Sequence, residues 1–146
     1  MFVVDASVWA SLFIVDDAHH VATRRWLDQV IDREEAICAP ISMLAELGGA
    51  VARRLTDSLA GRQAVNAVLQ LPNLHLDSVD ESLGLLGGQL AVDLRVRGAD
   101  ALYLALAVRL AIPLVTWDRG QRERGSGVVR TLSPEEAPAD GRRDGE

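Results

Sequence analysis

The segment GADALYLALAVRLAIPLVTWD, residues 98–118, joins an apolar helix to a short strand. Residues 99–111 have the composition of a buried helix, and Pro113 separates them from the apolar run 114–116. Because Arg109 and Pro113 interrupt this apolar stretch, it falls short of the roughly 20 residues that span a bilayer. We therefore predict a buried helix that leads into a strand, and no membrane span.

The same alternation of strand and helix extends over the rest of the chain. Strands are predicted at residues 2–4, 36–39, 74–76, 114–116 and 128–132. Helices are predicted at residues 7–15, 18–33, 43–55, 58–71, 81–97 and 99–111. This order favours an α/β fold with a mostly parallel central sheet of about five strands and helices on both faces.

Length and composition predict one domain followed by a tail. The 146 residues fit a single domain, which we place at residues 1–134. Residues 135–146 are rich in Pro, Gly, Asp, Glu and Arg, so we predict a disordered C-terminal tail. No basic stretch precedes the first apolar residues, and Asp5 interrupts them too early for a signal peptide. With a single cysteine, Cys38, the chain is expected to be cytoplasmic.

The charge composition disfavours several function classes. The formal net charge of −6 disfavours a protein that coats nucleic acid by bulk electrostatics. All 15 cationic side chains are arginine, a pattern that coding bias explains as well as phosphate binding does. Without lysine, the phosphate-binding P-loop and the receiver domain are both disfavoured.

Four carboxylates stand out when the ends of the predicted elements are compared. Asp5 follows the first strand and Asp118 follows the fourth, Asp100 lies at the start of the most apolar helix, and Glu46 lies near the start of the helix after the second strand. Parallel sheets bind ligands at the carboxyl ends of their strands. If the first and fourth strands are neighbours, Asp5 and Asp118 lie at one edge of the sheet.

Each carboxylate also has a plain structural interpretation. Asp5 and Asp118 are suited to turns at strand ends, Asp100 is suited to capping a helix, and Glu46 lies away from the apolar stripe of its helix and so suits a solvated face. Together, however, several acids at one edge repel one another and require protons or cations. Oxygen ligands without His or Cys favour Mg²⁺ or Mn²⁺.

Four segments carry a family resemblance: VVDASV at 3–8, SMLAE at 42–46, GADALYLALA at 98–107 and LVTWD at 114–118. They resemble the PIN-domain ribonucleases, and most closely the VapC toxins of bacterial toxin–antitoxin pairs. The resemblance runs from Phe2 to about Pro134. It implies a PIN-like three-layer fold.

The resemblance further implies a metal-dependent endoribonuclease whose acidic quartet, which would hold Mg²⁺ or Mn²⁺, corresponds to Asp5, Glu46, Asp100 and Asp118. Ser7 and Thr116 correspond to helper hydroxyls. Metal-bound water would cleave RNA to leave a 5′-phosphate and a 3′-hydroxyl. Many relatives carry a fifth acid after the last one, where this chain has Arg119-Gly120-Gln121, so the number of metals stays open. The implied partners are an RNA substrate, a cognate antitoxin and a second copy in a homodimer.

Arginines near the acids are the candidate RNA-binding residues. Arg97 precedes Asp100, and Arg119 and Arg122 follow Asp118, although each is equally suited to an ordinary solvated charge or an ion pair. Two other functions remain open. A catalytically silent PIN-like module would bind RNA or protein, and a haloacid-dehalogenase-type phosphatase would need an Asp-x-Asp pair that Asp5-Ala6-Ser7 lacks.

Overall fold

The computed structural model describes residues 1–137 and shows a five-stranded sheet with helices on both faces. The strands are β1 (Phe2–Val4), β2 (Ile37–Pro40), β3 (Leu74–Asp77), β4 (Leu114–Val115) and β5 (Thr131–Leu132). The helices are α1 (Ala6–Phe13), α2 (His20–Asp32), α3 (Met43–Leu55), α4 (Ser58–Leu69), α5 (Glu81–Leu94), α6 (Gly98–Leu110) and α7 (Arg119–Gly125). The predicted α/β class, with its parallel central sheet, is confirmed.

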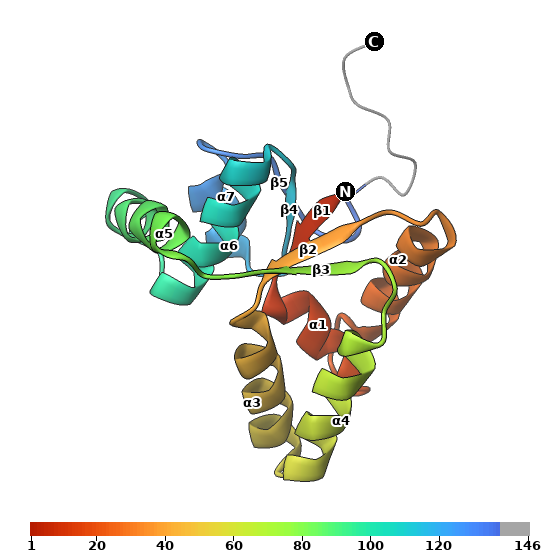
Figure 1. Ribbon diagram of the computed structural model, residues 1–146. Helices are drawn as coiled ribbons and strands as arrows, with labels where there is room; N and C mark the ends of the chain where they lie inside the picture. Colours follow the sequence, from red (N-terminus) through yellow and green to blue (C-terminus); the bar gives the residue numbers. More distant parts are fainter. Residues whose placement is uncertain (138–146) are drawn as a thin grey trace.

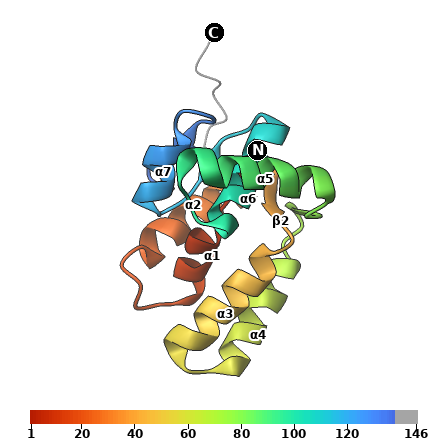
Figure 2. The same ribbon diagram turned by 90° about the vertical axis from the view of Figure 1, so that its left-hand side faces the viewer.

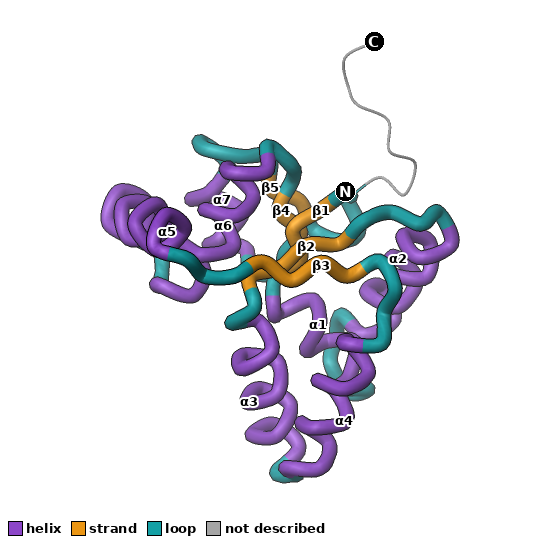
Figure 3. Tube along the Cα trace, in the orientation of Figure 1, coloured by secondary structure: helices purple, strands orange, loops and turns teal. Residues whose placement is uncertain are grey.

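The strand order is β3-β2-β1-β4-β5, and all pairings are parallel. The chain builds outward from β1 on one side and then returns to β4 on the other. Right-handed crossovers therefore place α1 to α4 on one face and α5 to α7 on the other. Figure 1 shows these two layers, Figure 2 shows them turned by 90°, and Figure 3 separates strands from helices by colour.

The core lies on both faces of β1, which is the central strand. Val3 and Val4 are buried there, and Trp9 of α1 and Tyr103 of α6 are among the largest fully buried side chains. Helix α6 contacts β1, β2 and β4, which explains why the centre of the apolar stretch, residues 103–107, is fully buried. Within residues 1–137, every helix is too short or too polar to cross a bilayer.

Most predicted boundaries agree with the structure to within two residues, and three differences are larger. Helix α7 was not predicted, because its seven residues, RGQRERG, have no apolar periodicity. Helix α5 ends at Leu94 instead of continuing to residue 97, since Arg95 adopts the left-handed conformation at its C-cap. The expected strand at 128–132 is confined to Thr131–Leu132.

The predicted tail lies largely outside the described residues. Residues 133–137 form a turn in which the Ser133 N–H donates to the Glu136 carboxylate at 2.8 Å. Ala137 is buried against the core. The remainder of the tail, 138–146, is not described.

Candidate active site

Asp5 and Asp118 meet where the strand order reverses, between β1 and β4. The Asp5 backbone N–H donates to the Val115 carbonyl at 3.0 Å, which extends the β1–β4 pairing to the carboxylate itself. Asp5 is 4% exposed and caps α1 by accepting the Ser7 N–H at 3.0 Å. Asp118 caps α7 by accepting the Gln121 N–H at 2.9 Å. The sequence suggested turns at these strand ends, and in the structure each acid caps the helix that follows its strand. Both also lie at the edge of the sheet where α/β folds bind ligands.

The hydroxyls of Thr116 and Ser7 connect the two acids. Thr116 Oγ1 donates to Asp5 Oδ2 at 3.1 Å and accepts the Asp118 N–H at 3.1 Å. Ser7 Oγ lies 3.2 Å from Thr116 Oγ1 and accepts the Trp117 N–H at 3.1 Å. Because the Thr116 proton is directed at Asp5, Ser7 must be the donor to Thr116. The chain of bonds fixes the orientation of the Asp5 carboxylate.

Glu46 is brought towards this edge from the first turn of α3. It is half-buried, and the Tyr103 phenol of α6 donates to its Oε1 at 2.9 Å. The expectation that Glu46, taken alone, sits on a solvated helix face is therefore wrong. Tyr103 was not singled out from the sequence, although its hydroxyl is the polar group in the otherwise apolar run 101–108.

Asp100 lies in the first turn of α6, facing Arg97. The N-cap of this helix is Arg97, so the capping interpretation of Asp100 is wrong. The Arg97 Nε donates to Asp100 Oδ2 at 3.1 Å, and its Nη2 lies 3.6 Å from Asp118 Oδ2. Gln121, a second residue that sequence reasoning missed, donates its side-chain amide to the Asp100 carbonyl at 3.2 Å. Arg97 therefore bridges two of the four acids.

The electrostatics of the quartet reflect burial and mutual repulsion. Burial raises the pKa of Asp5, the negative charge of Asp100 raises it further, and the hydrogen bonds from Ser7 and Thr116 oppose the rise. Burial likewise raises the pKa of Glu46, with added repulsion from Asp5 and Asp100 and opposition from the Tyr103 hydrogen bond. Asp5, Glu46 and Asp100 thus lie within one another's fields.

The three candidate RNA-binding arginines are all engaged by the protein itself. Arg97 is paired with acids as described, although 79% of its side chain is exposed. The Arg119 Nε donates to Glu123 at 2.7 Å, and the Arg122 Nη1 donates to the Thr116 carbonyl at 2.9 Å. Arg122 therefore supports the loop that carries Thr116, while Arg97 and Arg119 remain at the surface.

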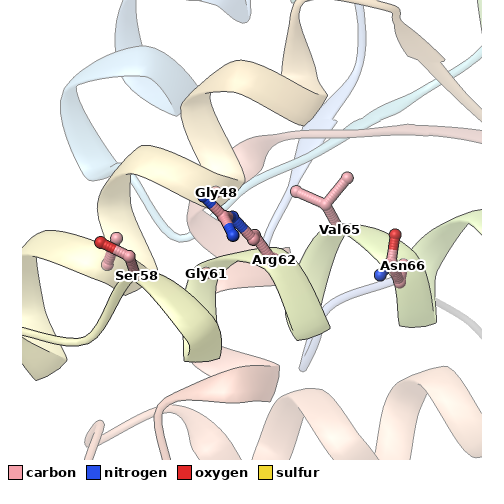
Figure 4. A pocket seen from close by; sticks show the side chains of 7 residues that line it. Gly48, Ser58, Gly61, Arg62, Val65 and Asn66 are labelled. Carbon is pink, nitrogen blue, oxygen red and sulfur yellow. The ribbon is translucent and has the colours of Figure 1, made fainter.

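A hollow of about 430 Å³ adjoins Glu46 and Ser7 between α1 and α3. It is lined by Ala6, Ser7, Ala10, Ala45, Glu46, Ala50 and Arg53. A second hollow, of about 340 Å³, lies between α3 and α4 (Figure 4). Its lining contains no carboxylate, so the first hollow is the one that belongs to the candidate site.

Comparisons with known proteins agree with this geometry. The family model of the PIN domain matches residues 2–126. Mycobacterium tuberculosis VapC20, described as a sarcin-ricin loop cleaving toxin, is a similar structure, with a TM-score of 0.73 and 21% identity over 88% of this chain and 97% of that chain. FitAcB from Neisseria gonorrhoeae gives a TM-score of 0.71 and 20% identity over 94% and 100%.

A third similar structure is VapBC2 from Rickettsia felis, described as bound to a DNA fragment from its promoter. Its TM-score is 0.69, with 14% identity over 90% of this chain and 97% of that chain. A search among curated proteins gave no significant match. At these identities the structural neighbours define the fold, which confirms the predicted PIN-like arrangement.

Proposed function

Because this chain belongs to the PIN-domain family, we propose that it is a metal-dependent endoribonuclease, the toxin of a type II toxin–antitoxin pair. The observation that carries the proposal is that the ends of β1 and β4, α3 and α6 each direct a carboxylate towards one edge of the sheet. Asp5 and Glu46 lie within the field of Asp100, and Arg97 joins Asp100 to Asp118. The neighbour described as cleaving the sarcin-ricin loop supports RNA as the substrate class. A further similar structure, described as a toxin–antitoxin complex from Klebsiella pneumoniae, supports the toxin role.

The donor set fits a hard divalent cation. Asp5, Glu46, Asp100 and Asp118 offer only carboxylate oxygens, which suit Mg²⁺ or Mn²⁺. Within residues 1–137, no three side chains of the His, Cys, Asp or Glu type stand close enough to hold one ion. Binding therefore requires the carboxylates to rotate towards one another, and it requires the Arg97 guanidinium to leave Asp100 and Asp118.

When bound, the ion would supply a nucleophilic water and neutralise charge on the phosphoryl oxygens, which are the two needs of phosphodiester cleavage. The chain's own contribution is positioning. Thr116 and Ser7 hold Asp5, Tyr103 holds Glu46, and the first turn of α7 holds Asp118. The expected products carry a 5′-phosphate and a 3′-hydroxyl, with no role for the ribose 2′-hydroxyl as nucleophile.

We further propose a cognate antitoxin, a homodimer and a cytoplasmic location. The neighbours that support an antitoxin are solved as VapBC and FitAB assemblies. Co-purification with the product of the adjacent gene tests the first of these partners, and light scattering tests the second. A protein that remains a monomer and retains no partner would contradict both.

The experiment that tests the proposed activity is cleavage of single-stranded RNA, with mapping of the new 5′ ends. Cleavage should require Mg²⁺ or Mn²⁺ and should stop in EDTA. Asp100→Asn should abolish cleavage and weaken Mn²⁺ binding in a calorimetric titration, because a ligand is lost. Asp93→Asn, on the exposed surface of α5, is the matched control and should leave both unchanged.

The alternative is a catalytically silent PIN-like module that binds RNA or protein. The bridge from Arg97 to two of the acids is the observation that favours it, since an arginine can neutralise a carboxylate pair without any metal. RNA binding with no cleavage, together with no Mn²⁺ binding by the wild-type protein, would establish this alternative and overturn the proposed nuclease.

A further inference from the structure

Trp117 is held beside the acidic quartet by bonds that orient its ring. It lies between Thr116 and Asp118, and its backbone N–H donates to Ser7 Oγ at 3.1 Å. The indole Nε1 donates to Thr23 Oγ1 of α2 at 2.8 Å. Thr23 is 1% exposed, and its hydroxyl lies 2.6 Å from that of Ser11. Hydrogen bonds from the backbone and from the indole therefore both fix the position of this ring, which is adjacent in sequence to Thr116 and Asp118.

His19 stacks on the face of this indole. The two ring centroids are 3.9 Å apart and the planes are inclined by only 9°. His19 is exposed at the N-cap of α2, and its backbone N–H donates to Asp17 Oδ1 at 2.8 Å. Trp9 and Trp26, in contrast, are 1% and 3% exposed within the core. Of the three tryptophans, Trp117 is therefore the one that is partly accessible to solvent.

The pair has the features of a surface that receives a planar ring. Core packing does not account for it, because His19 is exposed and extends the stack outward. The carboxylate beside it is neutralised, since Arg54 pairs with Asp17 at 2.7 Å, and this reduces repulsion of a phosphate backbone. Unpaired bases stack on aromatic side chains, histidine included, with little dependence on sequence.

We propose that the His19–Trp117 stack is a platform for one nucleobase of single-stranded RNA, next to the phosphate that the acidic quartet would cleave. The proposal rests on the proposed function and adds a substrate-binding residue to it. A base inside a duplex has both faces covered by its neighbours, so the platform would select a nucleotide that has left the stack. His19 contributes the outer ring, and Trp117 fixes its orientation.

The test compares three variants for binding to a short, fluorescein-labelled single-stranded RNA. Ca²⁺ replaces Mg²⁺, under conditions where no cleavage is detected. His19→Ala should weaken binding by about five- to twentyfold, the size expected for the loss of one stacked base. His19→Phe keeps a flat ring and should restore near wild-type affinity. His75→Ala, an exposed histidine on the edge strand β3, is the matched control and should bind as the wild type does.

A set of RNAs that each lack one base identifies the stacked nucleotide. At one position the missing base should lower affinity for the wild-type protein and cause no further loss in His19→Ala. Tryptophan fluorescence supplies a second signal, because Trp9 and Trp26 are buried and RNA quenching therefore reports Trp117. Wild-type affinity in His19→Ala, or failure of His19→Phe to restore binding, would overturn the platform.

The platform and the proposed function can fail separately. Metal-dependent cleavage by the wild-type protein, combined with undiminished RNA binding in His19→Ala, would remove the platform and leave the nuclease. Position-specific loss of binding in His19→Ala, without any cleavage by the wild-type protein, would keep the platform and remove the nuclease.

Discussion

At the carboxyl edge of the sheet, burial and mutual repulsion oppose the charged forms of Asp5 and Glu46. In the α3–α4 hairpin, by contrast, the backbones of the two helices approach each other closely. Figure 1 shows this hairpin projecting away from the sheet. At its crossing, a Cβ placed on Gly61 would lie 2.6 Å from the Gly48 carbonyl oxygen and 3.0 Å from the Ala52 Cβ. Electrostatic repulsion therefore limits which side chains the edge accepts, and steric contact limits which side chains the hairpin accepts. Substitutions in the two regions should separate activity from stability.

The largest effect is expected from removing one charge at the edge. Asp5→Asn keeps an oxygen that can accept from Ser7 and Thr116, so the fold should persist while cleavage falls by about 100-fold or more, as expected when a metal ligand is lost. Initial rates and chemical denaturation, measured on the same preparation, check both parts. Retained cleavage would remove Asp5 from the site.

In the absence of divalent ions, Asp5→Asn should also change how the free energy of unfolding depends on pH. The folded protein raises the pKa of Asp5 above its ordinary value of 3.8, so the native state holds this proton more tightly than the unfolded state does. The contribution of Asp5 to the free energy of unfolding is therefore greatest at low pH and declines as pH rises through the raised value. Asp5→Asn should reduce that decline and give a higher denaturation midpoint than wild type at neutral pH.

In the hairpin, the expected effect is on stability alone. Gly61→Ala should lower the free energy of unfolding by about 1–3 kcal/mol, because the methyl group forces the helices apart. Gly88→Ala is the matched control: it lies within α5, where a Cβ meets no atom within 4 Å, and should stabilise by about 0.5–1 kcal/mol. Cleavage per folded molecule should match wild type in both. A loss of activity in Gly61→Ala without unfolding would contradict the separation.

A smaller effect on activity is expected from removing the buried phenol of Tyr103, which holds Glu46. Tyr103→Phe removes the phenol that donates to Glu46 while leaving the ring in place. The loss of one such hydrogen bond corresponds to about 1 kcal/mol, or about a fivefold fall in kcat/KM if Glu46 depends on it. Steady-state kinetics and Mn²⁺ titration measure the change. An unaltered kcat/KM would show that Glu46 is positioned without Tyr103.

The smallest effect is expected from Arg97→Gln. Its ion pairs with Asp100 and Asp118 are exposed, and such pairs contribute about 0–1 kcal/mol. If Arg97 competes with the cation, Mn²⁺ binding should tighten by up to about fivefold when the charge is removed. Arg119→Gln, which lies near the site but pairs with Glu123, is the control and should not alter Mn²⁺ affinity. Weaker binding in Arg97→Gln would show that Arg97 supports the acids.

The order of strands and helices could be predicted because buried strands and buried helix faces place apolar residues at different spacings along the sequence. The sequence also predicted that Asp5 and Asp118 would share an edge if their strands were neighbours, and the structure pairs β1 with β4. Helix α7 escaped prediction since its seven polar residues are held by the Asp118 cap and not by an apolar face.

The side-chain contacts that shape the site could not be predicted, because they join residues that are far apart in the sequence. Tyr103 and Glu46 lie 57 positions apart, and nothing in either segment specifies that the phenol donates to the carboxylate. Similarly, the bridge from Arg97 to Asp118 depends on how α6 and the end of β4 are placed in space. The metal, the RNA and the roles of Ser7 and Thr116 remain predictions.

The central position of β1 also governs when the site can exist during folding. Ser7 and Thr116 are 109 positions apart, and the bond between them forms only after β4 has been added beside β1. Such long-range pairing is slow, since the intervening chain must be ordered first. A chain emerging from the ribosome exposes Asp5 early but gains Thr116 and Asp118 only when most of the domain has been synthesised. The growing chain therefore lacks the complete quartet until synthesis of the domain is almost finished.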